Sequence, residues 1–163
     1  MKQRYKYRIY PTPRQVHNLA KLFGCCRVVW NDSLALCNSS EKLPSNGDLQ
    51  KTFITQAKKS EEREWLTEVS NIPLQQSIAD LGVAWKNYFD SFQGKRKGRR
   101  VSHPKFKKRN SRQSARFRIG GFSMKHGKVY LSLHSIGRMI ANSVPSSGCD
   151  RTVILPPCFS IIE

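Results

Sequence analysis

Residues 5–34 read YKYRIYPTPRQVHNLAKLFGCCRVVWNDSL and contain two periodic patterns from which the rest of the fold can be built outward. Over residues 5–10, aromatic or apolar side chains alternate with basic ones, as is typical of a half-buried β-strand. Thr12 and Pro13 then supply an N-cap and a first helical residue. Because apolar residues recur from there at three- and four-residue spacing, we expect an amphipathic helix over about residues 13–36.

Two further helices follow along the chain. Residues 38–46 are polar and contain a proline, so they predict a loop. A helix is expected from residue 47 or 48 to about residue 60, followed by a short helical turn at Trp65 and Leu66. The apolar stripe over residues 73–92 predicts a third, longer helix. We expect these helices to pack as a small bundle.

Beyond Gly94 the hydrophobic period changes from 3.6 to 2. Residues 116–121 and 122–133 alternate apolar with polar side chains, and His126 with Gly127 supplies a turn, so a β-hairpin is expected here. A strand, then helices, then strands indicates an α+β fold in which a helical bundle is inserted in a small β-domain. The expected units are a first strand, a helical lobe, a basic connector with hairpin, and an irregular tail: 1–12, 13–93, 94–138 and 139–163.

Positive charge is concentrated in one half of the chain. The 163 residues carry a net charge of +18, yet residues 1–90 are nearly balanced, with 13 Lys or Arg and 9 Asp or Glu. Residues 91–149 hold 15 Lys or Arg and no acid. Mutual repulsion opposes a compact state in such a segment unless phosphates or counterions neutralise it. We therefore expect a nucleic-acid partner, DNA or RNA.

The candidate binding residues lie in the segment 94–120, which contains 12 of these cations. Gly98 and Pro104 interrupt any helix there, and Phe106 and Phe117 offer faces on which bases could stack. The alternative is a solvated charge run without a partner. Arg4, Lys6 and Arg8 on the first strand could extend the same surface or form an ordinary solvent face. The candidate residues are Lys95, Arg96, Lys97, Arg99, Arg100, Lys105, Phe106, Lys107, Lys108, Arg109, Arg112, Arg116 and Arg118.

Catalytic, metal and membrane signals are not found in the sequence. The cysteines form no C-x-x-C pair, and the four histidines are scattered, so we expect no metal, no cofactor and no catalytic residue. Cys25, Cys26 and Cys37 are expected to pack as small apolar side chains. No run reaches the roughly 18 apolar residues of a membrane span, so we expect no membrane partner. A cytoplasmic protein is expected, and the sequence makes no prediction of its oligomeric state.

Three blocks of the chain resemble a known family in order and spacing. They are YKYRIYPTPRQVHNLAKLFGCCRVVWNDSL, LQQSIADLGVAWKNYF and KRKGRRVSHPKFKKRNSRQSARF, and the run G-C-x-R-x-x-x-N at residues 24–31 is the most specific part. Together they resemble the N-terminal region of OrfB/TnpB proteins of bacterial insertion sequences, which are relatives of type V CRISPR nucleases. The resemblance covers about residues 4–138.

The resemblance implies a helical recognition lobe inserted in an oligonucleotide-binding-like β-barrel. In full-length relatives, which are metal-dependent nucleases, a RuvC-like nuclease domain and a zinc ribbon follow. Beyond Asp90 the only acids here are Asp150 and Glu163, too few for a two-metal phosphodiester site. We therefore expect a nucleic-acid-binding N-terminal fragment of a transposase without nuclease activity. The alternative is a stand-alone basic RNA-binding accessory protein.

The last 25 residues, 139–163, depart from this resemblance. They show no clear periodicity, whereas the family is expected to continue as regular strands. We interpret them as an irregular tail produced by a frameshift or premature stop near Arg138. The alternative is a divergent C-terminal strand.

Overall fold

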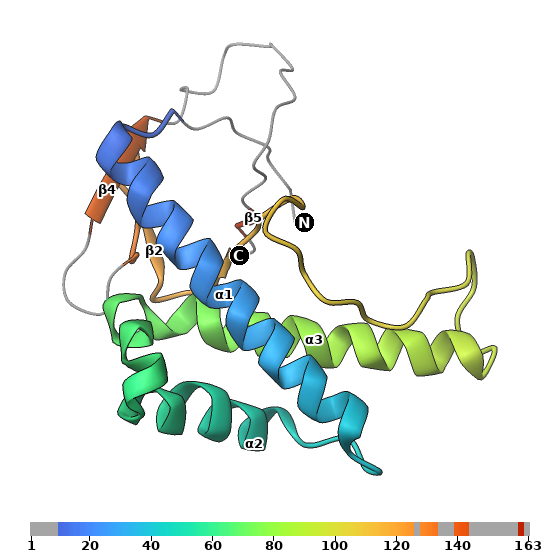
Figure 1. Ribbon diagram of the computed structural model, residues 1–163. Coiled ribbons are helices and arrows are strands. Elements are labelled where there is room, and N and C mark those ends of the chain that lie inside the picture. Colours follow the sequence, from blue (N-terminus) through green and yellow to red (C-terminus); the bar gives the residue numbers. More distant parts are fainter. Residues whose placement is uncertain (1–9, 126–127, 134–138, 144–159, 162–163) are drawn as a thin grey trace.

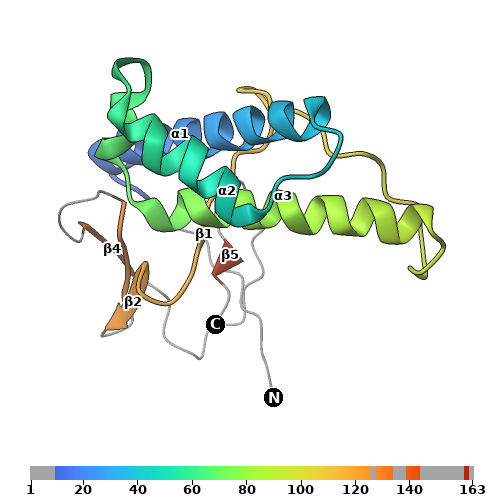
Figure 2. The ribbon, with the colours of Figure 1, turned by 90° about the horizontal axis from the view of Figure 1, so that it is seen from below.

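The computed structural model describes residues 10–125, 128–133, 139–143 and 160–161 (Figure 1). Its helices and strands are segregated. Viewed from below, the three α-helices form one layer and the short strands lie on one side of it (Figure 2). The predicted α+β class is therefore confirmed.

Helix α1 (Pro13–Ser39) begins where the sequence predicts. The backbone N–H of Thr12 donates to Gln15 Oε1 at 2.8 Å, which ties down the first turn. The predicted apolar stripe is buried along most of its length, Leu22 and Leu34 completely, but Val16 is 51% exposed near the start. The helix ends three residues later than expected, at Ser39.

Helix α3 (Asn71–Phe92) crosses α1 and forms the other main wall of the core (Figure 1). Ser70 caps it, since its Oγ accepts from the Ile72 N–H at 3.4 Å. Ser77 Oγ donates to the Cys26 carbonyl of α1 at 2.9 Å and so joins the two helices. The last turn lies beyond the bundle, and Phe92 is 68% exposed there.

The second helical arm has the predicted extent but not the predicted regularity. It consists of α2 (Asn46–Gln50), the π-helical η1 (Lys51–Gln56) and the 3₁₀ turns η2 (Ala57–Lys59) and η3 (Glu61–Glu68). The Ala57 N–H bonds to the carbonyls of Thr52 and Ile54, so the turn is widened. β-Branched side chains are frequent in this arm and weaken a regular α-helix. Ile54 is nevertheless buried.

The predicted hairpin forms, while its expected turn residues, His126 and Gly127, lie outside the described residues. β2 (Phe122–Lys125) pairs antiparallel with β3 (Lys128–Leu131), with Lys125 opposite Lys128. The expected strand over 116–121 is wrong in length, because β1 (Arg116–Phe117) has two residues. Gly120, at φ 92°, and the bond from the Gly121 N–H to the Arg118 carbonyl turn the chain there.

The prediction of an irregular tail over 139–163 is wrong for two segments. β4 (Met139–Ser143) pairs antiparallel with β3, and β5 (Ser160–Ile161) pairs parallel with β1. Without β4, strand β3 would expose unpaired backbone groups along one edge, and this need for a partner leaves no periodic signal in the sequence.

The oligonucleotide-binding-like barrel stays a prediction. The described strands form two separate sheets, β1–β5 and β2–β3–β4. The expected first strand, with Arg4, Lys6 and Arg8, lies outside the described residues.

The hydrophobic core joins both layers. Leu22, Leu34, Leu74, Ile78 and Leu81 of α1 and α3 are completely buried, and Phe117 and Leu133 reach the same cluster from the strand side. The Ser70 N–H donates to the Leu133 carbonyl at 3.1 Å, which attaches the start of α3 to the end of the hairpin. None of the described helices is both long and apolar enough for a transmembrane segment.

Candidate nucleic-acid interface

The basic segment, residues 94–118, folds back along α3 rather than extending into solvent (Figure 1). The Val101 N–H donates to Ser91 Oγ at 3.0 Å near the end of α3. His103 then packs edge-on against Trp85, with ring centroids 4.5 Å apart. At the far end, Arg118 Nη2 donates to Gln75 Oε1 at 3.1 Å, near the start of α3. The segment therefore runs antiparallel to α3 along most of that helix.

Helix α1 holds the middle of the segment by its backbone. Asn31 Nδ2 donates to the Lys107 carbonyl at 3.1 Å, and the Lys107 N–H donates to Asn31 Oδ1 at 2.9 Å. The indole N–H of Trp30 donates to the Lys105 carbonyl at 3.1 Å. A single amide side chain thus replaces a neighbouring strand and satisfies both backbone groups of Lys107.

Lys107 is an internal cation. Its Nζ lies 4.0 Å from the centroid of the Trp30 ring, in cation–π geometry. Burial lowers the pKa of Lys107 from its ordinary value, although Cys26 and Asp80 oppose that shift. This candidate residue is therefore turned into the protein and is poorly placed to meet a phosphate.

Arg116 is also engaged inside the protein. Its Nη2 lies 2.6 Å from Asp80 Oδ1 of α3. Burial raises the pKa of Asp80 even though Arg116 and Lys107 both favour the carboxylate. Arg116 thus pairs the basic segment with a carboxylate of α3, and the positive charge of Lys107 also favours the ionised form of Asp80.

The other ten cations of the segment are exposed. Gly94 and Gly98, both at positive φ, turn the chain at the end of α3, and residues 95–100 lie entirely at the surface. Phe106 is 54% exposed, which leaves its ring free to stack, whereas Phe117 is 1% exposed and belongs to the core, so its expected role as a stacking face is wrong. The exposed cations are Lys95, Arg96, Lys97, Arg99, Arg100, Lys105, Lys108, Arg109, Arg112 and Arg118.

The sequence did not predict which residues of α1 would position this segment. Arg27 and Asn31 are one helical turn apart on α1, in the run G-C-x-R-x-x-x-N. Arg27 Nη1 donates to Gln113 Oε1 at 3.2 Å, and Asn31 holds Lys107. Two polar side chains four residues apart, and therefore on the same side of the helix, were the available signal. The most specific motif of the N-terminal half is thus the docking site for the basic segment.

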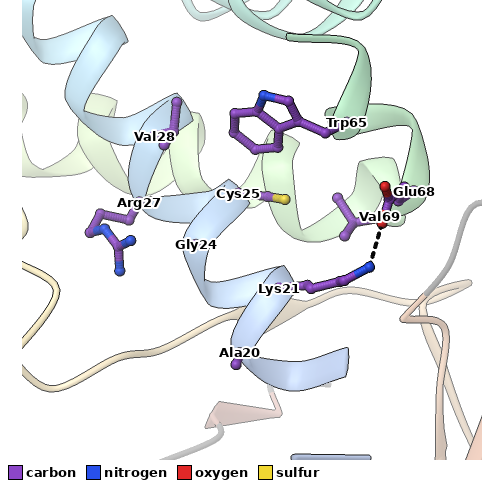
Figure 3. A pocket seen from close by; sticks show the side chains of 9 residues that line it. All are labelled: Ala20, Lys21, Gly24, Cys25, Arg27, Val28, Trp65, Glu68 and Val69. Atoms are coloured by element: carbon purple, nitrogen blue, oxygen red, sulfur yellow. Dashed lines mark hydrogen bonds and ion pairs between the residues drawn. The ribbon is translucent and has the colours of Figure 1, made fainter. Parts of the chain in front are cut away.

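A pocket of about 300 Å³ lies on the other flank of α1, between this helix and η3 (Figure 3). Lys21 Nζ and Glu68 Oε2 pair at 2.7 Å at its edge, and Trp65 projects toward α1 (Figure 3). Burial, followed by the nearby Glu68 carboxylate, raises the pKa of Cys25 to about 11. The thiol is therefore protonated at neutral pH and is a poor nucleophile or metal ligand.

The cysteines of α1 pack as expected. Cys25, Cys26 and Cys37 are 4%, 2% and 5% exposed, and burial raises the pKa of Cys26 to about 12. Among the residues that the structure describes, no three His, Cys, Asp or Glu side chains are grouped so that they could hold a metal ion.

A family of helix-turn-helix domains, HTH_OrfB_IS605, matches residues 1–42 of this chain. Within residues 10–42, the part of this match that the structure describes, the chain forms one uninterrupted helix, α1. The polar groups of α1 that contact the basic segment, Arg27 and Asn31, fall inside the matched region.

Curated proteins with similar sequences include two whose names contain "Putative RNA-guided DNA endonuclease". One, from Streptomyces pristinaespiralis, is 33% identical over 136 residues, which are 81% of this chain and 32% of that protein. InsQ from Escherichia coli (strain K12) is 30% identical over 122 residues, 72% of this chain and 28% of that protein. This chain therefore matches about a third of the length of each of these relatives.

A third similar protein is matched over nearly all its length. It is the virulence protein VsdF of Salmonella dublin, which is 33% identical over 132 residues, 74% of this chain and 92% of that protein.

Proposed function

Because this chain belongs to the OrfB/TnpB-type transposase-like proteins of bacterial insertion sequences, we propose that its basic segment, residues 94–118, binds DNA or RNA. The helical bundle is the scaffold that presents this segment. The proposed setting is the cytoplasm, where both nucleic acids are present.

The observation that carries the proposal is an exposed, acid-free row of cations on a backbone that is held in place. Ten Lys or Arg side chains of the segment are exposed, while no Asp or Glu occurs between residues 91 and 149. A solvated charge run has no need of the buried contacts that Trp30 and Asn31 make with the segment. A fixed backbone lets neighbouring cations meet successive phosphates without a large loss of chain entropy on binding.

Phe106 adds a second kind of contact. It lies between Lys105 and Lys107, whose backbones α1 holds, and its ring is 54% exposed. Stacking on an aromatic side chain contributes about 1–3 kcal/mol per base to single-strand binding. We propose that Phe106 stacks on an unpaired base while the cations around it contact the backbone.

We propose further that the chain binds nucleic acid without cutting it. Metal-assisted phosphodiester cleavage needs several converging carboxylates, and the described residues contain no such group. The relatives whose names record RNA-guided DNA endonucleases extend well beyond the matched region. VsdF is matched over 92% of its length, which favours a second candidate, a binding module that acts apart from a nuclease.

The test is the salt dependence of binding to labelled duplex and single-stranded oligonucleotides. If about six cations meet duplex phosphates, log K should fall against log salt concentration with a slope on the order of −5. Replacing Lys105, Lys108 and Arg109 by Gln should reduce that slope by about one per lost contact. The matched control replaces three exposed cations of the second arm and its loop, Lys42, Lys51 and Lys59, by Gln, and removes the same charge.

A neighbouring pair of substitutions sharpens the test. Lys107→Gln should leave the salt slope unchanged, since this side chain lies on Trp30, whereas Lys108→Gln should reduce it by about one. A slope near zero for the unaltered chain, or equal losses in the segment variant and its control, would show that the basic segment is only a solvated connector.

A further inference from the structure

The turn at residues 108–111 is organised by a single side-chain amide. Gln113 Nε2 lies 3.0 Å from the Lys108 carbonyl, 3.0 Å from the Arg109 carbonyl and 2.7 Å from the Ser111 carbonyl. The N–H and Oγ of Ser111 also donate to the Lys108 carbonyl, at 3.2 and 2.7 Å. Three carbonyl groups of one turn therefore converge on the same nitrogen.

Helix α1 fixes the direction in which that amide points. Arg27 Nη1 donates to Gln113 Oε1 at 3.2 Å. A guanidinium can only donate, so it must face the amide oxygen, and the amide N–H₂ must then face the turn. The orientation of Gln113 is thus determined from both of its ends.

Peptide geometry gives the consequence for the outer side of the turn. In a trans peptide, the C=O of one residue and the N–H of the next point in opposite directions. Since the carbonyls of residues 108, 109 and 111 point to Gln113, the N–H groups of Arg109, Asn110 and Arg112 point away from it. Within the described part of the chain, none of these three N–H groups has a hydrogen-bond partner.

The side chains around these N–H groups have the charge that an anion requires. Lys108, Arg109 and Arg112 are all exposed. The three salt bridges found among the described residues involve Lys21, Arg63 and Arg116, so none of them engages these cations. Successive backbone N–H groups that face outward bind anions in many phosphate sites, and cationic side chains add to the attraction.

We propose that residues 108–112 form a phosphate-binding loop, which takes one phosphodiester group of the bound nucleic acid on the N–H groups of Arg109, Asn110 and Arg112. Gln113 is the positioning residue. It contacts no ligand itself, and it keeps the carbonyl groups of the loop turned inward. The inference rests on the proposed function and assigns a particular contact to it.

The first test compares two substitutions that change the net charge equally. Gln113→Glu keeps an acceptor for Arg27 but removes the donors, and its carboxylate repels the three carbonyls. Gln93→Glu is the control, since Gln93 is exposed beside the basic segment and only its backbone bonds. We expect Gln113→Glu to weaken oligonucleotide binding at least about tenfold and Gln93→Glu about twofold. Both add one negative charge, but only the former disturbs the backbone N–H groups that would donate to the charged phosphate.

The second test needs no substitution. Amide resonances of the unaltered chain are followed by NMR while a dinucleotide with one phosphodiester is added. The N–H signals of Arg109, Asn110 and Arg112 should shift downfield together, more than those of residues 95–100. This NMR experiment tests the phosphate-binding loop even if Gln113→Glu proves unstable in a melting experiment.

The outcomes separate the two proposals. If the unaltered chain binds oligonucleotides with a steep salt slope, but Gln113→Glu and Gln93→Glu lose affinity equally and the three amides do not shift, the phosphate-binding loop is wrong and the proposed function stands. If the unaltered chain binds no oligonucleotide, the proposed function fails first. Shifts caused by anionic lipid vesicles but not by the dinucleotide would overturn the assignment to nucleic acid.

Discussion

Asn31 holds the basic segment through its backbone rather than through its charges. Its side chain donates to and accepts from the backbone of Lys107, at 3.1 and 2.9 Å. We expect Asn31→Ala to lower the free energy of unfolding by about 1–3 kcal/mol, because two partly buried backbone groups lose their partners. Chemical denaturation measures this change.

A second readout distinguishes local release from general loss of stability. With Asn31→Ala, trypsin should cleave after Lys105 and Lys107 faster than in the parent chain, while the helical content stays constant. Asn38→Ala is the control, because Asn38 is exposed on the same helix and its side chain makes none of the hydrogen bonds found among the described residues. Equal cleavage rates in the two variants would contradict the assigned role of Asn31.

Composition was enough to find the candidate surface, but it could not show which of its cations are exposed and which are turned into the protein. The absence of acids in residues 91–149 marked the segment. The inward position of Lys107 and Arg116 could not be predicted, since it depends on Trp30 and Asp80, which lie on two other elements. Gln113 gave no signal either, because a polar residue in a polar segment has no distinguishing pattern.

Two glycines in helices α1 and α3 should respond differently to the same substitution. A Cβ on Gly24 would have no atom closer than Arg27 Nη2 at 3.9 Å, whereas one on Gly82 would lie 2.6 Å from Asn46 Oδ1. We expect Gly24→Ala to raise the free energy of unfolding by about 0.5–1 kcal/mol, since alanine restricts the unfolded chain and favours the helix. Gly82→Ala should bring no such gain, because the Asn46 side chain must move.

Thermal unfolding of the two glycine variants and the parent chain provides the measurement. A difference of about 1 kcal/mol corresponds to a few degrees for a chain of this size. If Gly82→Ala stabilises the protein as much as Gly24→Ala, then the Asn46 side chain moves aside at no measurable cost.

The elements that were predicted correctly are those whose own sequence determines them. Thr12 and Pro13 fix the start of α1, and long apolar stripes define α1 and α3. The prediction for the second arm was wrong in detail, because residues 51–59 combine helical spacing with β-branched side chains, which weaken a regular α-helix. β4 and β5 are short, and their pairing partners lie elsewhere in the chain, so no local sequence pattern predicts them.

The net charge of +18 should make the stability of the whole protein depend on ionic conditions. Repulsion among the exposed cations opposes folding and is screened by salt, since the Debye length falls from about 30 Å at 0.01 M to about 8 Å at 0.15 M. We expect the melting temperature to rise with sodium chloride over this range. A polyanion such as heparin should raise it further, because it binds the folded cation row.

The charge in residues 95–100 allows a control. Replacing Lys95, Arg96, Lys97, Arg99 and Arg100 by Gln removes five exposed charges. The variant should melt at a higher temperature than the parent at low salt, and its melting temperature should rise less with salt. An identical salt response in both chains would place the repulsion elsewhere.

The contact of Asn31 with Lys107 joins an early segment of the chain to a later one, and this order matters while the protein is being made. The three α-helices that the structure describes precede the basic segment in the chain, so they leave the ribosome first and can begin to pack before that segment emerges. The groups that receive it, Trp30, Asn31 and Asp80, are then already assembled on the bundle. The basic segment can therefore dock soon after it emerges, which shortens the time for which its cations are free to bind the RNA of the ribosome that produces them.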